Sequence, residues 1–140
     1  MPKGSCICGK LTYEYDQAAL KAICHCLTCR KLTGSPYLTA ILVPENNVKM
    51  NTTAPKITDA VHEVGMTMQF HGCDTCPSTI YKTAAGFAGF KIVFAGTLDG
   101  SEDVGTEGKP QQEIWVKYRV PWLSALEGCE QFEEFPPGDE

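Results

Sequence analysis

ICHCLTCRKLTGS, residues 23–35, is the stretch that decides the fold, because it places three cysteines within six positions. Seven of the eight cysteines fall into three short groups: Cys24, Cys26 and Cys29; Cys6 and Cys8; Cys73 and Cys76. Spacings of one or two residues bring neighbouring sulfurs toward one point, which suits metal chelation and suits a strain-free disulfide poorly. The sequence therefore predicts zinc. Because a closed tetrahedral site takes four sulfurs, three remain for a second ion with a free coordination position.

Length and charge limit the class of protein. With 140 residues, the chain is predicted to form one domain over residues 1–140. Its 12 basic and 17 acidic residues give a net charge of −5, so it lacks the basic field that nucleic-acid binding needs. The opening residues MPKGSCICGK contain no apolar signal region, and no run reaches the roughly 18 apolar residues of a membrane span. We expect a soluble, intracellular and cytoplasmic protein with no nucleic-acid or membrane partner. Four disulfides in a secreted protein are the alternative.

Short alternating or apolar runs, separated by glycine and proline, predict an all-β domain. The candidate strands are residues 11–15, 37–43, 66–70, 79–83, 91–95 and 113–118. Residues 16–23 are ambiguous, because alanine and leucine favour a helix and Asp16 could cap it. We expect residues 100–110, which are polar and rich in glycine, to form a mobile surface loop, and residues 133–140 to form a flexible tail.

The two outer cysteine pairs are predicted to close one structural zinc site, with ligands Cys6, Cys8, Cys73 and Cys76. Each pair lies in a tight turn, or knuckle, whose backbone N–H groups face the sulfurs. Two knuckles so far apart in sequence would fasten the N-terminal strand to the centre of the domain. A partition that combines Cys6 and Cys8 with a central cysteine is the alternative.

The central group, Cys24, Cys26 and Cys29, is predicted to hold a second zinc ion with catalytic potential. Three thiolates on Zn²⁺ carry a net charge of −1, so the metal keeps affinity for a substrate thiol or for a water molecule whose pKa it lowers. Arg30 and Lys31 follow at once, and they either attract an anionic substrate or form a solvated basic pair. Backbone amides in the turn at Gly34 and Ser35 could receive a carboxylate.

The remaining candidates have competing interpretations. His25 lies between two ligands, and we expect it to point away from the metal and to support the site or contact substrate. Cys129 could supply a fourth thiolate and close the second site, or it could be a small buried hydrophobic residue. His62 and His71 are expected to be ordinary strand or surface histidines.

The whole pattern resembles the glutathione-dependent formaldehyde-activating family of zinc proteins. The similarity extends over nearly the entire chain and is carried by five segments: GSCICGKLTYEY at 4–15, CHCLTCRKLTGS at 24–35, CDTCPSTIY at 73–81, AGTLDG at 95–100 and IWVKYRVPWL at 114–123. The resemblance implies an Mss4-like fold of several coiled antiparallel sheets, with a strand over residues 18–23. It also implies the same division into structural and catalytic zinc ligands that the spacing favours.

The family's reaction joins glutathione and formaldehyde as S-hydroxymethylglutathione, so the resemblance implies a carbon–sulfur lyase or synthase. Around the catalytic ligands Cys24, Cys26 and Cys29, we expect the thiol-substrate pocket to be shaped by His25, Arg30, Lys31, Thr33, Gly34 and Ser35. A non-catalytic zinc scaffold, or an enzyme for a different aldehyde or thiol adduct, is the alternative.

Three departures from the family pattern leave the substrate open. Pro77 follows the last cysteine where glycine is common, and it removes an N–H group that might bond a sulfur. His71 and Gly72 are inserted between Phe70 and the cysteine pair, and Glu113 replaces a histidine carried by many relatives.

Overall fold

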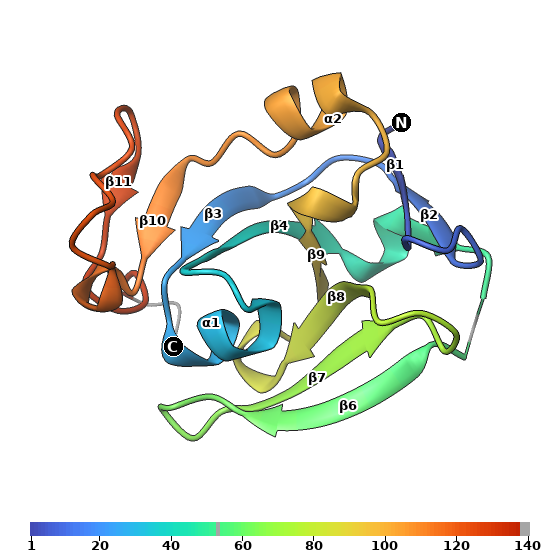
Figure 1. Ribbon diagram of the computed structural model, residues 1–140, viewed down its shortest axis with the longest axis horizontal. Helices are drawn as coiled ribbons and strands as arrows, with labels where there is room; N and C mark the ends of the chain where they lie inside the picture. The colour runs from blue at the N-terminus through green and yellow to red at the C-terminus, as the bar shows by residue number, and fades with distance from the viewer. Residues whose placement is uncertain (53, 138–140) are drawn as a thin grey trace.

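The computed structural model describes residues 1–52 and 54–137 and consists mostly of β-strands (Figure 1). A three-stranded sheet has the order β1–β2–β5, with bounds Lys3–Ser5, Thr12–Tyr15 and Val48–Met50. An eight-stranded sheet has the order β11–β10–β3–β4–β9–β8–β7–β6. Its strands, in chain order from β3, are β3 Leu20–Cys24, β4 Leu38–Pro44, β6 Lys56–Val61, β7 Thr67–Gly72, β8 Thr79–Ala84, β9 Phe90–Phe94, β10 Gln112–Ile114 and β11 Glu130–Gln131.

Helical segments are few and short. The α-helices are α1 (Leu27–Thr33) and α2 (Ser101–Thr106), and the 3-10 turns are η1 (Glu45–Asn47), η2 (Ala85–Phe87), η3 (Ala95–Thr97) and η4 (Val116–Tyr118). In Figure 1 the large sheet curls so that β3 and β4 lie on one side of α1 and β7 and β8 on the other. The all-β prediction is confirmed, and α1, β5 and β6 are elements that the sequence patterns did not reveal.

The large sheet is antiparallel except at one edge. There β10 pairs in parallel with β3, and β11 pairs in parallel with β10. A parallel pair needs a long connection, which the chain supplies because β4 to β9 lie between β3 and β10. The expectation of purely antiparallel sheets therefore fails at this edge.

Five of the six predicted strands are found as β2, β4, β7, β8 and β9, and the ambiguous segment before Cys24 forms β3. The prediction for residues 113–118 is wrong beyond Ile114. Trp115 takes a left-handed backbone conformation with φ 58°, and η4 follows. This break lets the Trp115 indole turn inward, where it is 2% exposed and stacks on Tyr118 with 6.0 Å between ring centroids.

Two segments expected to be mobile contain ordered structure. The polar segment at 100–110 includes α2. Phe135, near the start of the expected tail, packs edge-on against Trp115 with 5.4 Å between ring centroids. The mobility of both segments stays a prediction, and residues 138–140 of the tail lie outside the described residues.

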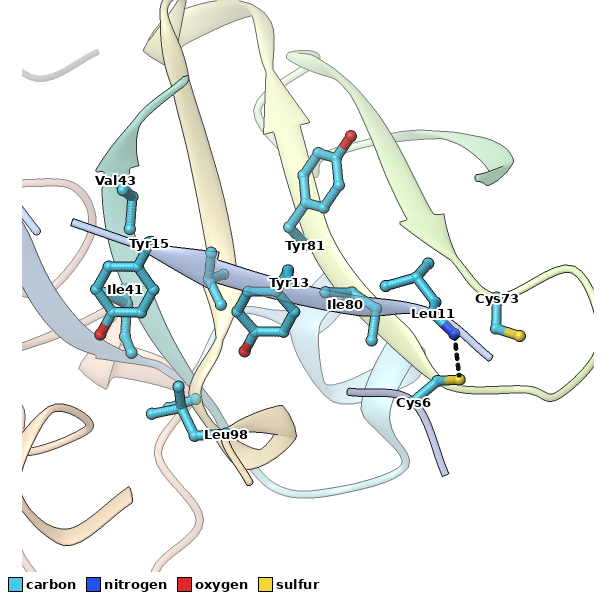
Figure 2. Close-up of a cluster of buried hydrophobic side chains, with 12 residues drawn as sticks. Cys6, Leu11, Tyr13, Tyr15, Ile41, Val43, Cys73, Ile80, Tyr81 and Leu98 are labelled. Carbon is cyan, nitrogen blue, oxygen red and sulfur yellow. Dashed lines mark hydrogen bonds between the residues drawn. The ribbon is translucent and has the colours of Figure 1, made fainter. Parts of the chain in front are cut away.

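Two clusters of buried side chains form the core; the first contains Cys6 and Cys73, and the second contains Cys24, Cys26 and Cys29. Figure 2 shows the first cluster, in which Tyr13 and Tyr15 of β2 lie against the large sheet while Cys6 and Cys73 stand together at one end. The second cluster surrounds Cys24, Cys26 and Cys29 and includes Phe70 and Trp115. The three central cysteines and two of the four outer ones are therefore held in packed apolar surroundings, which limit the movement of their sulfurs.

Candidate metal centres

The structure brings Cys6, Cys8, Cys73 and Cys76 together, with all four sulfurs within 4.8 Å of one another. The Cys8 sulfur lies 3.5 Å from that of Cys6 and 3.6 Å from that of Cys73. Cys6 and Cys73 are buried, whereas Cys8 is exposed. The grouping of the outer pairs is the one that the spacing favours, and the alternative with a central cysteine is not seen among the described residues.

Backbone N–H groups point at these sulfurs, as expected for knuckles. Leu11 N donates to Cys6 Sγ at 3.3 Å (Figure 2), and Thr75 N donates to Cys73 Sγ at 3.3 Å. A backbone hydrogen bond from Ser78 is the main cause that lowers the pKa of Cys76, to about 5. Ser78 thus supplies the donor that Pro77 cannot, so this knuckle tolerates proline. Such donors stabilise thiolates, the form that binds zinc.

Gly72 explains the unusual sequence before the second knuckle. The β7–β8 register shifts between His71 and Gly72, and Cys73 N donates to Ser78 O at 3.1 Å. A Cβ atom at Gly72 would lie 2.4 Å from that same carbonyl oxygen. The inserted pair therefore forms a bulge that requires glycine, because the chain folds back closely to bring Cys73 and Cys76 into the site.

The second group consists of Cys24, Cys26 and Cys29, whose sulfurs also lie within 4.8 Å of one another. Each of the three residues is at most 4% exposed. Within residues 1–52 and 54–137, no fourth ligand atom lies that close to all three sulfurs. Cys129 does not join the group, because its sulfur donates to Pro110 O at 3.3 Å.

Helix α1 begins within this group, directly after Cys26. Cys26 caps its N-terminus by accepting a hydrogen bond from Cys29 N at 3.3 Å, and Gly34 ends it in a left-handed conformation with φ 68°. Glu63, from the turn after β6, accepts bonds from Leu27 N and Thr28 Oγ1, both at 2.9 Å. The carboxylate of Glu63, which is distant in the sequence, therefore satisfies donors of the first helical turn. By holding this turn it also fixes the positions of Cys26 and Cys29.

Lys82 places a buried positive charge beside the three sulfurs. Its Nζ donates to Cys29 Sγ at 3.5 Å, and the residue is 8% exposed. Burial alone lowers the pKa of this amine, but the nearby sulfurs of Cys29, Cys24 and Cys26 outweigh burial and raise it. Bonds from Cys24 and Cys26, aided by Lys82, hold the pKa of Cys29 well below the ordinary value. The neighbouring sulfurs and burial raise the pKa of Cys24, so these directions favour a thiolate at Cys29. Three clustered cysteine sulfurs next to a buried cation form a donor set that fits Zn²⁺.

His62 lies at the same site, contrary to its interpretation as an ordinary histidine. A ring nitrogen of His62 lies within 4.8 Å of the Cys26 sulfur, and the residue is 3% exposed. Burial is the largest effect on this ring and lowers its pKa. Lys82 could have been found from the sequence, because it shares a strand face with Ile80 and Ala84. His62 and Glu63 gave no such signal, since they follow a strand that the pattern did not predict.

His25 points into a buried polar network rather than toward the sulfurs. Its Nε2 donates to Glu113 Oε1 at 2.7 Å, and His25 is 1% exposed. Glu113 Oε2 accepts bonds from Leu126 N at 2.7 Å and from Gln131 Nε2 at 2.8 Å, and Arg119 lies 3.3 Å away. Glu113 therefore orients His25, which lies between two candidate ligands in the sequence.

The other expected substrate contacts lie on and after α1. Arg30 is half-buried and Lys31 is exposed, and both stand in the last turn, where positive charge complements the helix dipole. Thr33 Oγ1 donates to Cys29 O at 2.8 Å and accepts from Ser35 N at 3.1 Å. These bonds give the segment a helix-ending role, and its contact with substrate stays a prediction.

The fold and the two sulfur groups define a small β protein that could hold two metal ions. The profile of the family described as glutathione-dependent formaldehyde-activating enzyme matches residues 1–118, so the chain belongs to this family. No curated protein matches it significantly. A crystal structure of a Rhodobacter sphaeroides protein is similar in fold, with a TM-score of 0.54 at 21% identity over 74% of this chain and 94% of that one. Among the described residues, none of the helices has the length and apolar character required to cross a membrane.

Proposed function

We propose that this protein is a zinc-dependent carbon–sulfur lyase or synthase, similar to S-hydroxymethylglutathione synthase, which joins the thiol of glutathione to an aldehyde. In this proposal, an Mss4-like domain carries a structural zinc ion on Cys6, Cys8, Cys73 and Cys76 and a catalytic one on Cys24, Cys26 and Cys29. The observation that carries the proposal is the three-sulfur group, which has no fourth protein ligand among the described residues and has Lys82 beside it. We place the protein in the cytoplasm, where thiols stay reduced.

The addition of the glutathione thiol to the aldehyde requires few protein side chains. The glutathione sulfur forms a bond to the carbonyl carbon, the carbon–oxygen double bond becomes single, and the thiol proton ends on the oxygen. A zinc ion, when bound, supplies a Lewis acid that lowers the pKa of a thiol. Lys82 Nζ is the buried donor placed to stabilise negative charge on the aldehyde oxygen. Arg30 and Lys31 offer positive charge to the carboxylates of glutathione.

The test is to load the protein with zinc and to follow glutathione–formaldehyde exchange by NMR. We expect wild type to accelerate exchange, and Cys26→Ser to fall to the uncatalysed rate and lose one of two zinc ions. Cys129→Ser is the matched control, because its sulfur lies outside both groups, and it should keep both the rate and the metal. A Cys26→Ser protein as fast as wild type would reject this site.

A non-catalytic zinc scaffold is the second candidate, and the near-complete burial of the three central sulfurs favours it. The two functions differ in how readily metal is lost. An enzyme with one incomplete site should release one zinc ion much sooner than the other during graded chelation. Two equally inert ions, together with no acceleration of exchange, would support the scaffold.

A further inference from the structure

A cavity of about 40 Å³ lies beside the three-sulfur group. Its wall contains Cys24, His62 and Lys82, and the other lining residues are apolar, including Ala84, Phe87 and Phe135. Cys24, His62, Lys82 and Ala84 are each at most 8% exposed, whereas Phe87 and Phe135 are half-buried. The cavity therefore combines an apolar lining with three chemically reactive side chains.

The polar residues of the wall connect the cavity to the candidate catalytic site. Cys24 belongs to the sulfur group itself, and Lys82 Nζ lies 3.5 Å from Cys29 Sγ. His62 Nε2 makes no hydrogen bond within the described residues, although Glu63 Oε1 lies 3.3 Å away. A polar group that reacts at the sulfurs would therefore meet donors, while any apolar substituent it carries would extend into the cavity.

Phe135 belongs to the wall of the cavity and touches both its polar and its apolar residues. Its ring lies 5.3 Å from the His62 ring and 5.7 Å from the Phe87 ring, between centroids. Backbone bonds hold this segment in place, with Trp115 N donating to Glu134 O at 3.2 Å. Phe135 lies beyond residue 118, where the family match ends, so this wall is a feature of this chain beyond the matched region.

We propose that this cavity binds the alkyl substituent of the aldehyde, so that the preferred substrate class is a short-chain aliphatic aldehyde rather than formaldehyde. A single water molecule needs roughly 10–15 Å³ on this measure, so the cavity has room for about three small groups such as methylenes. A hydrogen atom, the substituent of formaldehyde, would leave it empty. This inference rests on the proposed function, because it assumes the same addition reaction. The thiol adds to the carbonyl carbon and its proton goes to the oxygen, as with formaldehyde.

Binding of unreactive thioethers tests the cavity without relying on turnover. The probes are S-methylglutathione, S-propylglutathione and S-hexylglutathione, titrated calorimetrically into the zinc-loaded protein. Each buried methylene should tighten binding about fourfold, so the propyl compound should bind roughly 15-fold tighter than the methyl compound. The hexyl compound should gain nothing more in wild type, because a cavity of about 40 Å³ has no room for the additional methylenes.

Two variants change the cavity in opposite directions. Phe135→Ala removes a lining side chain and enlarges the cavity, and we expect the hexyl compound then to bind tighter than the propyl compound. Ala84→Leu fills the cavity, and it should abolish the advantage of propyl over methyl. Phe132→Ala is the matched control, since Phe132 belongs to the same C-terminal segment but does not line the cavity, and it should keep the wild-type order.

Exchange rates measured with formaldehyde, propanal and hexanal separate this inference from the proposed function. A preference for propanal that Phe135→Ala shifts toward hexanal supports both. Equal thioether affinities, or an order that Phe135→Ala leaves unchanged, would overturn the cavity assignment even if formaldehyde exchange is accelerated. If no aldehyde is accelerated, the proposed function fails, while a chain-length order in thioether binding would still support the cavity as an alkyl site.

Discussion

Replacement of Glu113 by glutamine should remove a major stabilising contribution at neutral pH. Burial by itself raises the pKa of this carboxyl, but hydrogen bonds from Leu126, His25 and Gln131, with Arg119 nearby, outweigh burial and lower the pKa from 4.5 to about 2. Because the folded state has the lower pKa, the contribution is complete above about pH 4.5 and is lost as the pH falls toward 2. At about 1.36 kcal/mol per pH unit, the difference amounts to about 3 kcal/mol.

Urea unfolding of wild type and Glu113→Gln, followed by tryptophan fluorescence, measures this contribution. The difference between the two proteins should be about 3 kcal/mol at pH 7, remain so at pH 5, and fall to about half near pH 3. Acid also releases zinc from thiolates, but it does so in both proteins, so the difference isolates the carboxylate. Glu134→Gln, which removes an exposed partner of Lys117, should cost less than about 1 kcal/mol. A Glu113→Gln protein within 1 kcal/mol of wild type at pH 7, or a difference unchanged at pH 3, would refute the reasoning.

Three other substitutions have outcomes set by local geometry. Gly72→Ala should destabilise the fold by about 1–3 kcal/mol and weaken zinc retention at the four-sulfur site, because its Cβ would meet Ser78 O at 2.4 Å; urea unfolding and metal analysis check this. Gly34→Ala should cost about 1–2 kcal/mol, because its φ of 68° disfavours a side chain, whereas Gly96→Ala, with open space and no positive φ, should cost less. Lys82→Met should lower the zinc affinity of the three-sulfur site roughly 10–100-fold, as measured by competition with a chelator. Equal zinc retention by Lys82→Met and wild type would show that the amine does not contribute to zinc binding.

The grouping of the cysteines could be predicted because it depends on short-range geometry. Cys24, Cys26 and Cys29 lie so close in sequence that any compact turn brings their sulfurs together. The outer pairs, Cys6/Cys8 and Cys73/Cys76, are the two pairs left outside this group, so they could be assigned to each other. Strands such as β4 and β8 could be predicted for a similar reason, since each carries its own apolar pattern.

The surroundings of the central sulfurs could not be predicted in the same way. Glu63 reaches α1 from a turn 35 residues away from Thr28, and Lys82 reaches Cys29 across 53 residues. Such contacts depend on how the sheet curls, which no local pattern encodes. The helix itself was missed because its first capping group is a cysteine sulfur, and cysteine is not among the residues that normally mark a helix start.

The residues after position 118 contact both Glu113 and the cavity beside the central sulfur group. The family match ends there, yet Leu126 and Gln131 complete the bonds to Glu113, and Phe135 lines the cavity beside Lys82. Both contacts act on the central sulfur group, one through the orientation of His25 and the other through the shape of the adjoining space. Three partners of Glu113, namely Arg119, Leu126 and Gln131, lie in this same segment. Glu113 and the C-terminal segment therefore form one structural unit, and substrate preference should follow that unit when it is exchanged between relatives.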